Sequence, residues 1–193
     1  MYSRMHSIAP KIATTTNLLA FTLVETMVAV AVLTISIVGP FQIVQGVLQN
    51  SYLVRDQLIA GALAQEGMEY VRAIRDSNYI YANHNATTRA WLYGLDGSTG
   101  PNCYTSACVL DPTQDGTANA VIACGDATCA TRPLYLSTAN LYNQQVSGTQ
   151  TRFTRKVQLT NVSATETMVT VTVTWSNHGT RTVVLVENMR DWL

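Results

Sequence analysis

The stretch that decides the fold is Phe21-Thr-Leu-Val-Glu-Thr-Met-Val-Ala-Val-Ala-Val-Leu-Thr-Ile-Ser-Ile-Val38, an apolar run with one charged side chain, Glu25. A bilayer core needs about 20 helical residues at a rise of about 1.5 Å each, and apolar residues resume after Gly39 and Pro40. The run therefore predicts a single membrane-spanning helix. A lone carboxylate in such a helix is costly unless a partner compensates it, so Glu25 is a candidate functional residue.

The flanking charges predict the orientation of this helix. Arg4 and Lys11 precede the run, no acid accompanies them, and the next basic residue is Arg55. Because positive charge stays on the cytoplasmic side, we expect the amino end in the cytoplasm and the remainder exported through the inner membrane. No small-x-small site ends the run, so the apolar segment is expected to be retained and not removed as a secretory signal.

The residues Ala20-Phe-Thr-Leu-Val-Glu25 resemble the processing site of type IV prepilins and of the pseudopilins of type II secretion. In that family a membrane prepilin peptidase cuts immediately before the Phe, and the new terminal amine is methylated. The resemblance implies cleavage between Ala20 and Phe21, methylation of Phe21 and removal of residues 1–20 as a leader. The family usually has Gly at the position of Ala20, and Ala is the nearest small substitute.

The chemistry of Glu25 can also be argued from charge alone. After cleavage, the amine of Phe21 would be a cation about one helical turn from Glu25, and an axially displaced neighbour could bring opposite charges together. Since buried ion pairs often only break even energetically, we assign Glu25, with Thr22 beside it, a role in the register of subunits in a filament. The alternative is an ordinary signal anchor in which Glu25 has no role.

The predicted long helix covers residues 21–76, and its N-terminal half is transmembrane before assembly. Gly39 and Pro40 predict a kink, because Pro40 lacks an amide proton and its ring crowds the preceding turn. Beyond them an apolar stripe with helical spacing should face the exported domain, and it comprises Val44, Val47, Leu48, Val54, Leu58, Ala62, Val71 and Ile74.

The end of this helix, residues 64–76, also resembles the minor pilins of the V-like group. It carries Glu66, Glu69, Arg72 and Asp76 at spacings of three or four residues. Such spacing predicts ion pairs along one side of the helix. We expect this side to be a solvated helix face of small energetic importance.

Residues 77–193 are predicted to form an exported β-rich domain. Residues 77–150 contain many turn signals, whereas 168–175 alternate strictly between valine or tryptophan and threonine, as in a half-buried strand. A second strand at 181–187 follows a turn, and a third precedes them at 153–159. The predicted fold class is therefore α+β: a long helix, as in type IV pilins, packed on a small antiparallel sheet, with a disulfide-containing loop region.

Four cysteines form two C-x4-C pairs, Cys103 with Cys108 and Cys124 with Cys129 in sequence order. In an exported domain they predict two disulfides, with three connectivities open. The rival interpretation is a four-cysteine zinc site, because this spacing is at the edge of the structural zinc range. We favour disulfides because of the predicted compartment, and we assign no metal site.

Other sequence features exclude several functional classes. The formal charge is 10 − 12 = −2 once Arg4 and Lys11 leave with the leader, so no basic field favours nucleic acid. Asp111, Asp115 and Asn119 suggest a calcium loop only poorly, because no full alternating acidic loop is present. No cofactor motif and no nucleophile–histidine motif occurs, and we therefore predict that the chain is not an enzyme.

Three functions agree with these features. The leading one is a minor type IV pilin that enters or primes a surface filament, and its near relative is a minor pseudopilin of a type II secretion system. The third is a membrane-anchored binding module that does not polymerise. The first two imply other pilin or pseudopilin subunits, the prepilin peptidase, the inner-membrane assembly platform and the lipid bilayer as partners.

Overall fold

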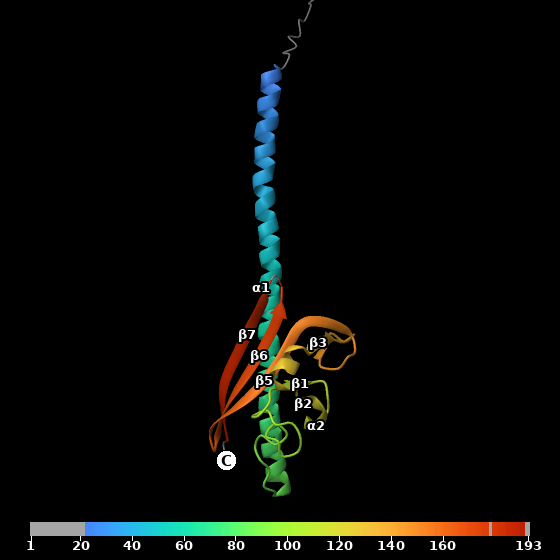
Figure 1. Ribbon diagram of the computed structural model, residues 1–193, viewed down its shortest axis with the longest axis vertical. Helices are drawn as coiled ribbons and strands as arrows, with labels where there is room; N and C mark the ends of the chain where they lie inside the picture. The colour runs from blue at the N-terminus through green and yellow to red at the C-terminus, as the bar shows by residue number, and fades with distance from the viewer. Residues whose placement is uncertain (1–21, 178, 192–193) are drawn as a thin grey trace, which may run out of the picture. The chain divides into compact units, whose positions relative to one another are not determined.

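The computed structural model describes residues 22–177 and 179–191 (Figure 1). They belong to two compact units, which divide between Leu48 and Gln49. Helix α1, Leu23–Asn85, contributes to both units, and an antiparallel sheet belongs to the second. The chain is therefore of the α+β class, as predicted.

The helix of the first unit has no polar face. Its large apolar side chains are all more than half exposed, from 54% at Val38 to 75% at Leu23. By length and composition this helix could cross a membrane. Gly39 and Pro40 are both helical, and the kink at these residues stays a prediction.

In the second unit, one face of α1 is buried against the sheet (Figure 1). The buried apolar residues of this face recur at three- and four-residue steps and are Ala60, Leu63, Ala64, Met68, Val71 and Ile74. The prediction was right for Val71 and Ile74 but wrong for the other members of the stripe, which are exposed: Val44, Val47, Leu48, Val54, Leu58 and Ala62. The small residues Ala60, Ala64 and Gly67 lie on this buried face and let the helix approach the sheet closely.

Helix α1 continues to Asn85, beyond the predicted end at Asp76. Asn78 explains the extension, because its side chain is buried and donates hydrogen bonds to the carbonyl oxygens of Trp91 and Tyr93 at 3.2 and 3.0 Å. The loop after the helix thus folds back and stabilises the last turns. A polar residue with distant partners does not show in a hydrophobic pattern. The last turns of α1 could therefore not be predicted from that pattern.

Three long strands form an antiparallel meander: β5, Thr149–Ser163, β6, Glu166–Ser176, and β7, Thr180–Arg190. The alternation in β6 is confirmed, with Val169, Val171, Val173 and Trp175 buried. The threonines between them are half-buried on the other face. All three predicted strands are present and are longer than predicted, because backbone pairing continues beyond the alternating residues.

Residues 77–150, which carry the turn signals, contribute four short strands that extend this sheet to seven strands. One edge of β5 pairs with β6, and its other edge pairs with two short strands. These are β1, Cys108–Leu110, and β3, Pro133–Leu136, which pair with different parts of β5. β2, Val121–Ala123, pairs with β1, and β4, Tyr142–Asn143, pairs with β3. Two short helices lie between them, α2 at Thr117–Ala120 and α3 at Gly125–Ala130.

Candidate functional site

The first turn of α1 carries the two residues assigned to subunit register. The Glu25 N–H donates to the Thr22 hydroxyl at 3.3 Å and to the Thr22 carbonyl oxygen at 3.0 Å. Thr22 therefore caps the helix, and a glutamate three residues after a capping threonine is the sequence signature of such a start. No helix cap was predicted at this position. The negative charge of Glu25 at a helix N-terminus is also favourable.

The other hydroxyl side chains of residues 22–38 are satisfied within the helix. Thr26 and Thr34 donate to carbonyl oxygens of the preceding turn at 2.8 Å, and Ser36 does so at 2.7 Å. The Glu25 carboxylate, by contrast, contacts no cation among the residues that the structure describes. It is therefore the polar group of this apolar segment that still needs a partner.

The predicted cleavage and methylation residues, Ala20 and Phe21, lie outside the described residues. The structure therefore does not describe the amine that would face Glu25, and the processing of the chain stays a prediction. The two predicted register residues, Thr22 and Glu25, are both described, and they are in contact.

The four cysteines form two disulfides, Cys103–Cys108 and Cys124–Cys129. This confirms the predicted bonds and selects one of the three connectivities, in which each C-x4-C pair closes on itself. The four thiols are consumed, so the four-cysteine zinc site is not formed. Such short loops stabilise by about 2 kcal/mol each in the chain-entropy model.

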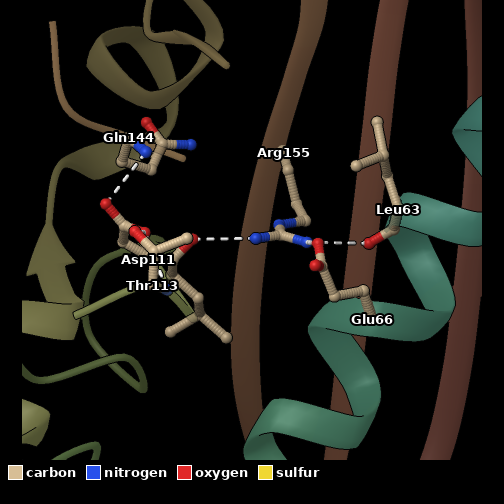
Figure 2. Close-up of polar contacts among 7 residues, drawn as sticks. Leu63, Glu66, Asp111, Thr113, Gln144 and Arg155 are labelled. Atoms are coloured by element: carbon tan, nitrogen blue, oxygen red, sulfur yellow. Dashed lines mark hydrogen bonds and ion pairs between the residues drawn. The ribbon is translucent and has the colours of Figure 1, made fainter. Parts of the chain in front are cut away.

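Asp111 of the calcium hypothesis holds loops together. It is buried, and its Oδ1 accepts hydrogen bonds from the N–H and hydroxyl of Thr113 at 3.1 and 2.5 Å. Its Oδ2 accepts the Gln144 N–H at 3.0 Å (Figure 2). In residues 22–177 and 179–191 no group of three metal-ligating acids, histidines or cysteines is present.

Arg155 is the residue that the sequence analysis missed. Its side chain is fully buried and donates to the carbonyl oxygens of Leu63 at 3.0 Å and Leu110 at 2.9 Å, as well as to the Glu66 carboxylate (Figure 2). One guanidinium thus joins α1, β5 and β1. The available signal was its position, because Phe153, Arg155 and Val157 alternate toward the core.

The charged residues at 66–76 were expected to form a solvated helix face of small energetic importance. This expectation is wrong for Glu66 and Arg72, which bind the sheet. Glu66 pairs with buried Arg155, and Arg72 pairs with both Glu69 and Glu187 of β7. Hydrogen bonding to Glu187 raises the pKa of Arg72. Among the described residues, the Glu69–Arg72 pair has the predicted spacing, and Asp76 instead pairs with its neighbour Arg75 at 2.9 Å. The pairs Glu66–Arg155 and Arg72–Glu187 fix the helix to the sheet.

Two tyrosines of the second unit have perturbed acidity. Burial raises the pKa of Tyr70, and the carboxylates of Asp111 and Asp115 raise it further. Burial also raises the pKa of Tyr104, whose hydroxyl lies 2.6 Å from the Thr167 hydroxyl. In both groups burial therefore favours the neutral phenol in the folded state.

Comparison with known proteins yields no relative. No protein-family model matches the chain, and no match was found among curated proteins or among solved structures. The resemblance at residues 20–25 and the chemistry of Glu25 are therefore the basis for a function.

Proposed function

We propose that this chain is a minor type IV pilin, a structural subunit that enters or primes a surface filament. The observation that carries the proposal is the carboxylate of Glu25, which contacts no cation among the described residues and begins a stretch, residues 26–54, that has no other charged side chain. A single isolated acid of this kind is expensive in lipid. A counter-ion from a neighbouring subunit would remove that cost.

The exposed apolar side chains of residues 23–48 support the same proposal. Fully burying one such side chain is worth about 1.5–3 kcal/mol, so this surface is unfavourable in water. Lipid covers it before assembly, and helices of other subunits cover it afterwards. In a filament with packed helices at its centre, these apolar side chains would be buried between the helices.

The proposed assembly step pairs two groups from different subunits. Cleavage before Phe21 produces an amine at the start of the helix, and the Glu25 carboxylate of a subunit displaced along the axis accepts it. The Thr22 cap fixes the first turn, which limits where the carboxylate can lie. Because a buried ion pair adds little net stability, its proposed role is to select one stagger.

The second unit suits an exported position. Its two disulfides are typical of oxidising compartments, and the basic residues Arg4 and Lys11 favour a cytoplasmic amino end. We therefore propose a single-pass protein of the inner membrane that later enters the filament. The proposal gives the chain a structural role and no enzymatic one.

A minor pseudopilin of type II secretion is the second candidate, because it shares the resemblance at Ala20–Glu25. The two differ in the filament that contains the chain: a surface pilus, or the short pseudopilus of a secretion machine. A membrane-anchored module that never polymerises is the third.

The test is to identify the mature chain in purified filaments of the source cell. We expect its N-terminal peptide to begin with methylated Phe21, and we expect Ala20→Leu, which replaces the small residue at the cleavage site, to leave the chain uncut and outside filaments. A start at Met1, or a cut beyond Leu48, contradicts the proposal. A chain cut at Phe21 that stays in the membrane identifies the non-polymerising module instead.

A further inference from the structure

A pocket of about 780 Å³ opens in the second unit between α1, β5 and β7. Three arginines line it, Arg55 from α1, Arg152 from β5 and Arg181 from β7, together with one acid, Asp56. Three positive charges against one negative charge leave a formal charge of +2. The pocket therefore has the electrostatic character of an anion site.

The floor of the pocket is held together by Asp56. This carboxylate is 6% exposed, and its Oδ2 accepts hydrogen bonds from Arg152 at 3.1 Å and from Asn177 at 2.9 Å. Asp56 thus neutralises Arg152. Arg55 and Arg181 are exposed, and neither has an ion-pair partner among the residues that the structure describes.

The position of Arg55 in the sequence relates this pocket to the membrane. Residues 26–54 contain no Asp, Glu, Lys, Arg or His, so Arg55 is the first ionised side chain after Glu25. As a continuous helix these 29 residues would cover about 43 Å, which is more than the roughly 30 Å of a hydrocarbon core. A helix with Glu25 just inside the cytoplasmic edge of the core, where its charge is costly, would therefore bring Arg55 out of the core on the opposite, headgroup side.

We propose that this pocket binds the phosphate of an acidic glycerophospholipid headgroup and so holds the domain at the membrane surface before assembly. The inference rests on the proposed membrane span. Arginine forks match phosphate oxygens in geometry and charge, and Arg55 and Arg181 supply two of them. Tyr52 lines the same pocket and is 61% exposed, as suits an aromatic side chain at a membrane–water interface.

A second copy of the chain is a less suitable occupant. Several carboxylates of the second unit already have ion-pair partners: Glu69 and Glu187 both contact Arg72, Asp76 contacts Arg75, and Glu166 contacts Arg190. The phosphate of an acidic headgroup has no counter-ion of its own in the lipid. Such phosphates are abundant in the headgroup layer, where the proposed span places Arg55. The observations therefore favour lipid over a protein carboxylate.

The test uses the full chain, extracted in detergent and given an equal mixture of phosphatidylglycerol and phosphatidylcholine. Native mass spectrometry then measures which lipid stays bound. We expect the chain to retain the acidic lipid about tenfold more than the zwitterionic one. The double variant Arg55→Gln/Arg181→Gln should lose this preference, whereas Arg190→Gln, on the same strand as Arg181 but outside the pocket, should keep it.

Three results would overturn the inference. The double variant could retain as much acidic lipid as the unmutated chain, or inorganic phosphate alone could displace the lipid, which identifies a free-anion site. Cross-linking from the pocket to a second copy in preference to lipid identifies a subunit contact. Extraction of the chain from membranes by alkaline carbonate would instead refute the proposed span, so the two failures are distinguishable. Equal thermal unfolding of all variants establishes that each is folded.

Discussion

Gly67 of α1 and Arg155 of β5 fit together closely: a Cβ atom at position 67 would lie 3.2 Å from Arg155 Cδ and 3.1 Å from a methyl carbon of Val171. Arg155 is buried and its guanidinium is held by three acceptors, so it has little freedom to move. The absence of a side chain at Gly67 is therefore what allows a buried arginine between helix and sheet.

Gly67→Ala should accordingly destabilise the second unit by about 1–3 kcal/mol, because the added methyl overpacks the interface. The matched control is Gly61→Ala in the same helix, where nothing lies within 4 Å of the added carbon. That change should stabilise by up to about 1 kcal/mol through helix propensity. Denaturant unfolding of the full chain in detergent measures both, and equal effects would refute the close fit.

Arg155→Ala should cost about 3 kcal/mol, since it leaves a void and removes a donor from the buried carbonyl oxygens of Leu63 and Leu110. Arg190→Ala is the control, because its side chain is 72% exposed and lies 3.6 Å from Glu166. Because Arg190 is solvated and its contact with Glu166 is long, this pair should contribute less than about 1 kcal/mol. The same unfolding measurement decides, and similar losses for the two variants would show that Arg155 is not the central anchor.

The two disulfides should differ in importance although their loops have equal length. Cys103 and Cys108 are fully buried in the main core, whereas Cys129 belongs to a smaller cluster and Cys124 is half-buried. Replacing the first pair with alanines should therefore lower the free energy of unfolding more, by the lost packing added to a loop term of about 2 kcal/mol. A larger loss from the second pair would contradict this ranking.

The raised pKa of Tyr104 predicts a loss of stability in alkali. The folded state holds the phenol proton more tightly than the unfolded chain does, so this contribution is complete below pH of about 10 and disappears as pH rises through the folded pKa. Tyr104→Phe should be less stable than the unmutated chain at pH 8 by about 1 kcal/mol, because it loses the contact with Thr167. Its free energy of unfolding should decline less between about pH 9 and 11, because it has no phenol to ionise at this position. Tyr79→Phe, a tyrosine of α1 with 41% exposure, is the control. Parallel declines in all three chains would refute the assignment.

The sequence predicted the features that depend on local periodicity. The alternation at Met168–Trp175 identified β6, the spacing of the cysteines and the predicted compartment identified two disulfides, and the apolar run identified the start of α1. It predicted the buried face of α1 only in part, at Val71 and Ile74, because the spacing of apolar residues does not show that Ala60, Ala64 and Gly67 are the positions that lie close to the sheet. Long-range partners carry no local signal.

The same reasoning explains what was missed at the site. Arg155 occupies a core position of an alternating strand, but its three acceptors come from α1 and β1, far away in sequence. Asp56 similarly depends on Arg152 and Asn177. The capping role of Thr22 toward Glu25, by contrast, was readable from the sequence, since it depends on residues three positions apart.

The most direct test of the central claim is the incorporation of Glu25→Gln into filaments. This variant keeps the size of the side chain and removes the charge that is proposed to select the subunit stagger. Ser36→Ala is the control, because the Ser36 hydroxyl donates to the carbonyl oxygen of Val32 in its own helix. Quantitative mass spectrometry of purified filaments should show the glutamine variant reduced at least tenfold and the control unchanged. Equal incorporation of Glu25→Gln and the unmutated chain, with both cut before Phe21, would contradict the account.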